Sequence, residues 1–315
     1  MLPSSRLLLL LAAAAVGQDQ SARIGEIEFF GYAGLDLNEI RAALSTHEGD
    51  TLAFTDAAVG QVRAAVIKDV ARATGHEPTD VSATCCDKQG QWMIYIGLPG
   101  KSNGGLHYHA RPTGSAKLPA DIVKLYERAM DANADAVRRG KAGEDDSKGY
   151  SLSEDPAYRS IQLEMRKYAE GHDAEIRKVL ESSADAHERR VAAELLGYAR
   201  QSKQQIQALA AAATDPDSEV RNNVTRALAV LTGSNASVSG QIPAGPFIDM
   251  LSSGSWSDRN KAGWLLSILV AYKDPKLLAE IRARAVVSLK EMAGWRDPGH
   301  ADSFRSILNA IGVER

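Results

Sequence analysis

Apolar residues in the second half of the chain recur at helical spacing. In the stretch 213–231, Val220 and Leu228 fall on one face of a helix, and further Val, Ala and Leu residues complete the stripe. The preceding Asp-Pro-Asp predicts a turn, and Asp217 or Ser218 is expected to cap the helix that follows. This stretch is therefore predicted to be a turn followed by an amphipathic helix.

The same turn and helix occur three times. Asp185 and Arg189 precede Asp217 and Arg221 by 32 positions, and Arg259 follows Arg221 by 38 positions. A shorter apolar helix precedes each copy, at 174–183, 204–213 and 245–253. A two-helix unit cannot bury its apolar face alone, because that face needs a neighbour. The copies are expected to stack into an all-α solenoid over residues 156–315 that ends in a C-terminal cap.

These units resemble HEAT repeats of the short bacterial kind. The resemblance covers about residues 172–272 and depends on the Asp in the turn, the early Arg and the Ala-x-x-Leu-Leu that follows. It implies an α-solenoid whose concave face takes a protein or peptide partner. It also implies that Arg189, Arg221 and Arg259 bond the neighbouring turn. Together with Asp185 and Asp217, these arginines are expected to be structural residues of the repeat.

The first hundred residues follow a different pattern. The predicted elements are a strand from Ile24, helices at 35–45 and 56–75, and a hairpin at 79–99. Asp56 is the expected cap of the longer helix, and Gly75 its stop. The order β-α-α-β-β predicts a small α+β module at 24–98.

This module resembles a POTRA domain. The matching residues are Ile27, Phe29, Gly31, Gly49 and Asp50. The resemblance implies a module that binds partners by adding a strand to its sheet edge. Its relatives usually precede an outer-membrane barrel or act in division and secretion, but the chain continues here with helices. Membrane insertion is therefore not expected, and a role as a cell-envelope assembly helper is one alternative.

Residues 99–155 are expected to link the two parts and to contain one helix, from Ala120 to Arg139. The segment 99–119 is rich in Gly, Pro, Ser and Lys, and residues 141–156 form a second polar connector. The predicted fold class is therefore an α+β N-terminal module followed by an all-α HEAT-like solenoid.

The N-terminus predicts export. A single cation, Arg6, precedes an apolar run from Leu7 to Val16, and the small residues Ala15 and Gly17 precede a plausible cut before Gln18. Residues 1–17 are thus a predicted signal peptide, and the protein is expected to be periplasmic or extracellular. A net charge of −3 and a pI near 6.2 give no strong field for nucleic acid or anionic lipid.

Two pairs of residues were considered as chemical sites. Cys85 and Cys86 are the only cysteines, and neighbours in a strand point to opposite faces, so we expect packing rather than a bridge. His107 and His109 alternate in an extended segment and are weak candidates for metal ligands. Two histidines do not complete a metal site, so no metal, other cofactor or catalytic residue is predicted.

The sequence therefore predicts an exported, non-catalytic scaffold that binds a protein or peptide, without nucleic acid and without a membrane span. An exported enzyme with a metal or scattered active site near the inter-domain loop is a further alternative.

Overall fold

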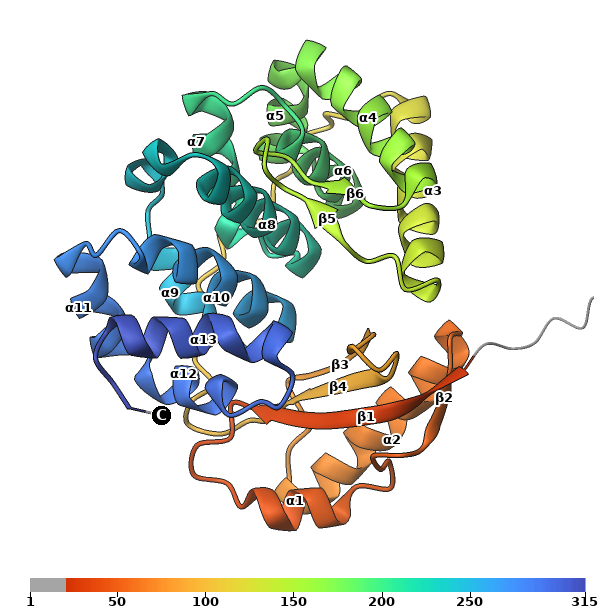
Figure 1. Ribbon diagram of the computed structural model, residues 1–315, viewed down its shortest axis with the longest axis vertical. Helices are drawn as coiled ribbons and strands as arrows, with labels where there is room; N and C mark the ends of the chain where they lie inside the picture. The colour runs from red at the N-terminus through yellow and green to blue at the C-terminus, as the bar shows by residue number, and fades with distance from the viewer. Residues whose placement is uncertain (1–20, 315) are drawn as a thin grey trace, which may run out of the picture.

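The computed structural model describes residues 21–314, so the predicted signal peptide lies outside the described residues. A small sheet with two helices forms the N-terminal module, and a long array of helices follows it (Figure 1). The order of these two parts confirms the predicted fold class.

The module is built on a four-stranded sheet with the order β2-β1-β4-β3. Its strands are β1 (Ser21–Phe30), β2 (Thr51–Ala53), β3 (Asp80–Cys85) and β4 (Trp92–Gly97). β1 pairs with β4 in parallel, and the other two pairings are antiparallel. The helices are α1 (Leu37–Ala43) and α2 (Asp56–Thr74). The short β2 adds a strand that the sequence pattern did not predict.

The ends of α2 show how local residues set its length. The side chain of Thr55 accepts a hydrogen bond from Ala58 N, so Thr55 and not Asp56 caps the helix. Gly75 adopts a left-handed conformation with a φ of 75°, which ends the helix as predicted.

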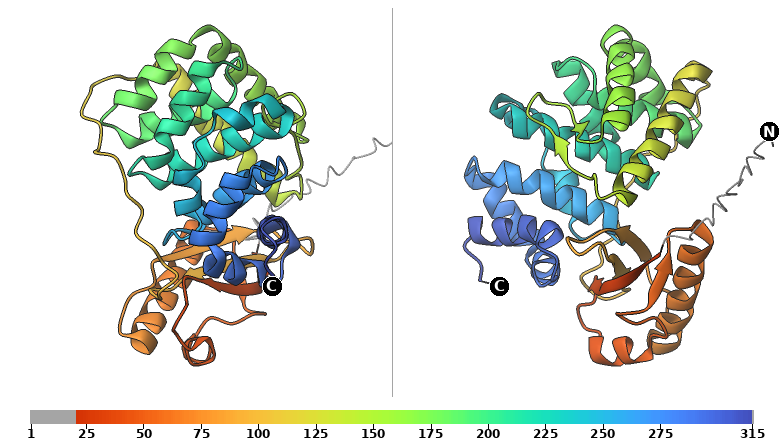
Figure 2. Two further views of the ribbon diagram at one scale, coloured as in Figure 1. Left: turned by 90° about the vertical axis from the view of Figure 1, so that its left-hand side faces the viewer. Right: turned by 45° about the vertical axis from the view of Figure 1, so that its right-hand side comes forward.

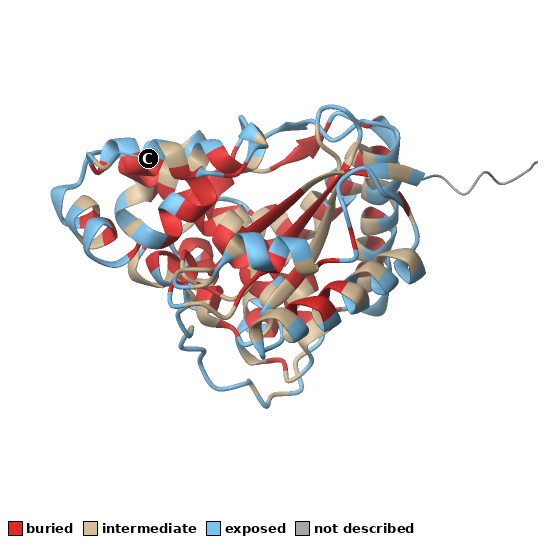
Figure 3. Ribbon diagram, turned by 90° about the horizontal axis from the view of Figure 1, so that it is seen from below, coloured by how far each residue is buried: buried red, intermediate tan, exposed pale blue. Residues whose placement is uncertain are grey.

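The sheet is buried on both faces. Ile94 and Ile96 pack with the module's own helices, whereas Met93, Tyr95 and Phe30 join the core of the helical array. Seen from below, the strands are buried, and exposure is concentrated on the outer helices and loops (Figure 3). This burial explains why β4 is apolar along nearly its whole length instead of alternating.

The helical part begins with α3 and a short hairpin and continues with stacked pairs. The hairpin strands are β5 (Glu144–Asp145) and β6 (Leu152–Ser153). The helices are α3 (Ala120–Arg138), α4 (Pro156–Gly171), α5 (Asp173–Ser182), α6 (Ala186–Gly197), α7 (Lys203–Ala211), α8 (Ser218–Ser234), α9 (Gly245–Met250), α10 (Trp256–Val270), α11 (Pro275–Arg284), α12 (Val286–Ala293) and α13 (Pro298–Ala310). Short 3-10 turns lie at Ala212–Thr214 and Ala236–Gln241.

The three predicted repeats are α5–α6, α7–α8 and α9–α10. Leu196, Leu228 and Leu266 occupy equivalent positions in the second helices, and each is fully buried. They belong to one apolar core that extends from the module to Ile311. One shared core is what stacked repeats require, so this packing confirms the solenoid prediction.

One further detail differs from the sequence predictions. Cys85 and Cys86, expected to be unbridged, are joined in a disulfide. β3 ends at Cys85, so Cys86 lies outside the strand. The expectation assumed that both side chains alternate within a strand, and this does not apply to Cys86. No helix within residues 21–314 is both long and apolar enough to span a membrane.

Candidate functional site

Buried arginines join each repeat to the next at the turn between its two helices. Arg189 donates to both carboxylate oxygens of Asp215 at 2.8 and 2.9 Å and to the Ser183 carbonyl at 2.9 Å. Arg221 donates to Asp258 in the same bidentate way, at 2.9 and 2.8 Å. We call these turns, at 183–185, 214–217 and 252–255, the turn ridge. Its ion pairs have their donors satisfied and lie out of contact with water, so their role is to fix the stack.

The aspartates predicted from the sequence, Asp185 and Asp217, are not the residues that accept hydrogen bonds from Arg189 and Arg221. Asp185 and Asp217 cap α6 and α8, and Asp217 also pairs with Arg190. Asp215 and Asp258 accept the buried arginines but occupy different positions relative to the caps. Because no fixed spacing relates them, the repeat alignment could not identify them.

The last repeat is completed by the N-terminal part of the chain. Arg259 has no aspartate in a following turn; it donates instead to the carbonyls of Ser253 at 2.6 Å and Ser102 at 3.1 Å. Its guanidinium also lies over the Phe30 ring, at 4.9 Å from the centroid, and 3.6 Å from Glu291. Burial lowers the pKa of Arg259 to about 10. Ser102, α12 and the end of β1 thus together take the place of the aspartate that a next repeat would supply.

Hydrogen bonds with α12 and with Trp295 hold the module against the helical array. Glu291 of α12 accepts hydrogen bonds from the backbone N–H groups of Gly31 at 2.8 Å and Tyr32 at 3.1 Å, and from Ser102 Oγ. Trp295 donates its indole N–H to the Phe29 carbonyl at 3.0 Å. These bonds join β1 to the end of the helical array, so the module is fixed to the array instead of hanging from a tether.

Residues 101–119 form a strap on the turn ridge. The strap runs from the sheet to the first repeats, as the left-hand view of Figure 2 shows. Gly104 N donates to the Ser252 carbonyl at 2.7 Å, His109 N to Thr214 at 2.9 Å and Gly114 N to Ser182 at 2.8 Å. Each bond reaches a different repeat. The segment expected to be a linker or long loop therefore contacts three repeats in turn.

The strap carries both candidate histidines. His107 and His109 are exposed and flank Tyr108, whose ring covers Arg221. His109 Nε2 lies 3.7 Å from Asp215, which is already bonded to Arg189. Within residues 21–314, no group of three His, Cys, Asp or Glu side chains could hold a metal ion. The structure therefore supplies no third ligand to these histidines.

A second surface lies on the opposite helices of the repeats. We call it the second-helix face; it is the surface of α6, α8 and α10 beside the hairpin and includes Glu194, Asn222, Arg226, Lys261 and Trp264. The β5–β6 hairpin lies over this face in front of α6 and α8 (Figure 1). Both carboxylate oxygens of Glu144 lie within 2.6 Å of Nη2 of Arg226. Gly149, in the turn of the hairpin, lies against Ser234 of α8.

Some charged residues of the second-helix face form no direct ion pair. Burial raises the pKa of Glu194, although Arg226 opposes this. Burial also lowers the pKa of Arg226, but Glu194 and Glu144 outweigh it and leave that pKa raised. Lys261 has no ion pair among the described residues, and burial followed by repulsion from Arg226 lowers its pKa to about 8. Its ammonium lies 5.9 Å from the centroid of Trp264. The face therefore presents two neighbouring cations, of which one is paired.

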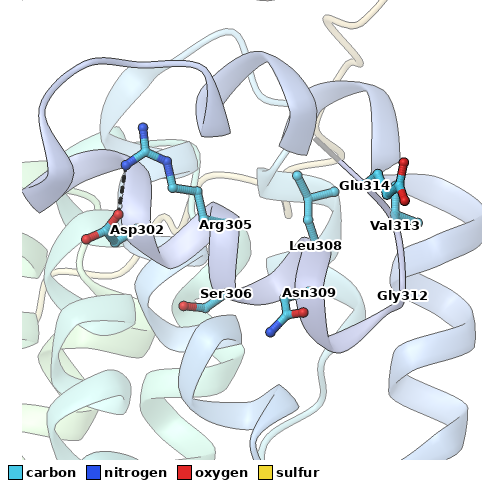
Figure 4. A pocket seen from close by; sticks show the side chains of 8 residues that line it. All are labelled: Asp302, Arg305, Ser306, Leu308, Asn309, Gly312, Val313 and Glu314. Carbon is cyan, nitrogen blue, oxygen red and sulfur yellow. Dashed lines mark hydrogen bonds and ion pairs between the residues drawn. The ribbon is translucent and has the colours of Figure 1, made fainter.

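Three surface hollows lie elsewhere. One of about 600 Å³ follows the outer side of α13, where Arg305 pairs with Asp302 (Figure 4). A second, of about 520 Å³, lies between His109 and the first helices α5 and α7. The third, of about 970 Å³, separates the β3–β4 turn and Cys86 from the end of α3. None of them brings a buried acid, base and nucleophile together.

The comparison with known families agrees with the repeat pattern. Residues 174–240 match HEAT repeats, so this part of the chain is a HEAT-like repeat array. The match does not extend to residues 24–98, and the resemblance of that module to POTRA domains stays a prediction. No curated protein matches the chain.

Proposed function

We propose that this protein is a non-catalytic interaction scaffold that binds a protein partner on the second-helix face, which we take as the concave face of the repeats. HEAT repeats favour protein partners, and the geometry favours this face over the turn ridge. The strap covers the ridge, and the arginine–aspartate pairs of Arg189 and Arg221 on it are buried. The observation that carries the proposal is the half-buried Trp264 with Lys261 beside it, since tryptophan is enriched among the residues that add most binding energy when a partner covers them.

The proposal is tested by site-specific photo-crosslinking. A photoreactive amino acid at Asn222, one helical turn from Arg226, is expected to capture a discrete partner from envelope extracts. The matched control carries the same group at the exposed Gln207 of the first helix α7. Capture at Gln207 but not at Asn222 would place binding on the wrong side and refute the proposal.

We further propose that the chain is exported. Arg6 and the apolar run that follows support it. Fractionation of cells and mass measurement of the mature protein test this. A mature N-terminus at Gln18 in the exported fraction is expected, whereas a full-length cytoplasmic product would contradict it.

Strand addition to the module has less support from the geometry. Asp80, at the start of the edge strand β3, accepts the Trp256 N–H at 2.8 Å, and Arg63 donates to the Val81 carbonyl at 3.0 Å. The solenoid and α2 thus occupy part of this edge. At this edge Ser82–Cys85 remain for a partner strand, and the opposite edge is the three-residue strand β2.

A further inference from the structure

The second-helix face holds an acidic segment of the chain itself. Residues 143–146, Gly-Glu-Asp-Asp, lie in an extended conformation at β5. Glu144 of this segment pairs with Arg226 through both carboxylate oxygens. Glu144 and Asp145 nevertheless remain exposed. The second-helix face is therefore already in contact with an extended acidic segment of the same chain, and this segment stays exposed to water.

The two strands of the hairpin are held very differently. β6 is anchored, because Leu152 and Ser153 are buried and Ser153 N donates to the side chain of Gln162 at 2.7 Å. β5 pairs with β6 over two residues, Glu144 with Ser153 and Asp145 with Leu152. Its contact with the helices is the pair with Arg226. Further hydrogen bonds flank this ladder. Glu154 N donates to the Gly143 carbonyl at 2.8 Å, and Gly143 N donates to the Glu154 carboxylate at 3.0 Å. Ser151 Oγ donates to Asp146. Even with these bonds the hairpin is short and two-stranded, which makes it marginally stable, so β5 can leave while β6 stays.

We propose that the partner contributes an extended acidic segment that replaces β5. It would pair with the backbone of β6, place one carboxylate on Arg226 and bring a second carboxylate to Lys261. Charge complementarity supports this occupant. Lys261 forms no direct ion pair within residues 21–314, although Glu144, Glu194 and Glu219 act on it from farther away. Displacing β5 would also free Arg226 from Glu144. The inference rests on the proposed function and specifies the chemistry of the partner.

The segment in cis then acts as a competitor. A tethered segment has a high effective concentration at its own site, so a peptide in trans meets an occupied face. Weakening the cis contact without removing the cations should therefore improve binding of an added peptide. This expectation separates an exchangeable ligand from a merely structural hairpin, for which the same change would have no such effect.

The experiment uses a fluorophore-labelled peptide of residues 142–147 and the full mature protein, followed by fluorescence anisotropy. Glu144→Gln keeps the size of the side chain and is expected to bind the peptide about tenfold more tightly than the unchanged protein. Glu144→Gln combined with Arg226→Gln should lose this binding, and with Lys261→Gln should weaken it. The matched control is the same peptide with glutamine at the position of Glu144, which should bind weakly to every variant.

Equal binding of the peptide to the unchanged protein and to Glu144→Gln would overturn the inference. So would undiminished binding by the Glu144→Gln/Arg226→Gln protein, provided that circular dichroism shows it folded; if it unfolds, the neutral Arg226→Met replaces Arg226→Gln. A negative peptide assay with intact crosslinking at Asn222 rejects the acidic partner and leaves the scaffold standing. A positive peptide assay without crosslinking at Asn222 supports the acidic site and counts against the scaffold.

Discussion

The turn ridge and the second-helix face both contain arginine–carboxylate pairs, but their surroundings differ. On the ridge, Arg189 and Asp215 are each about 1% exposed, and the arginine also bonds a backbone carbonyl. On the face, Arg226 is 19% exposed and Glu144 is 31% exposed. The same chemical pair is thus locked by the fold in one place and open to water in the other.

This difference decides what each pair can do. A buried pair cannot lose one member without leaving a charge that water does not reach, so it acts as a fixed joint. A pair near the surface can exchange one carboxylate for another, because water or a ligand takes over the released charge. The ridge therefore sets the geometry of the stack, and the face is free to bind.

The largest effect is expected on the ridge. Asp215→Ala leaves Arg189 buried without its carboxylate and should lower the free energy of unfolding by about 3–5 kcal/mol. Asp217→Ala, two residues away, removes a helix cap and a half-exposed pair and should cost about 1 kcal/mol. Urea unfolding compares the two variants. Equal losses would show that the ridge pairs are no more essential than the surface ones.

A similar effect is expected where the module docks. Glu291→Gln weakens the hydrogen bonds from Gly31 N and Tyr32 N and also leaves the buried Arg259, 3.6 Å away, without a carboxylate, so it should cost about 3 kcal/mol. Hydrogen exchange is expected to become faster at these two amides. Glu280→Gln, in an exposed pair with Arg284, is the control and should leave both amides unchanged.

The comparison also shows which features a sequence can reveal. The repeats were predictable because their apolar positions recur along single helices and Asp217 caps its own helix locally. Asp215 and Asp258 were not predictable as arginine partners. Asp215 pairs with an arginine 26 residues earlier in the chain and Asp258 with one 37 residues earlier, so no common spacing identifies them.

The role of the strap and of the hairpin could not be predicted for a different reason. Both segments are polar and contain glycine, which is the composition of a linker. The strap meets the repeats largely through backbone groups, and the hairpin meets α8 through Glu144, whose partner Arg226 lies 82 residues later in the chain. Gly104, Gly114 and Gly149 contribute to these contacts without any side chain to show it. Burial of Met93 and Tyr95 against the solenoid likewise depends on docking that no local pattern encodes.

The unpaired cation of the face predicts a pH dependence. Lys261 has a folded-state pKa of about 8, below the value of about 10.4 in an unfolded chain. Between these values the unfolded state binds more protons, so stability should rise with pH over this range. Urea midpoints measured from pH 7.5 to 9.5 should rise in the unchanged protein relative to Lys261→Gln. Parallel curves would mean that this lysine is freely hydrated.

The smallest effect is expected from the exposed partner of Arg226. Glu144→Gln should change the free energy of unfolding by less than about 1 kcal/mol, because a pair near the surface contributes little. Hydrogen exchange at 144–146 should nevertheless accelerate, whereas Ser153, whose amide bonds Gln162, should stay protected. Glu144→Gln leaves the charge of Arg226 without its partner. The double variant Glu144→Gln/Arg226→Gln removes both charges and is the control for that effect. A loss from Glu144→Gln as large as that from Asp215→Ala would make the hairpin a fixed joint, and the distinction between the two surfaces would fail.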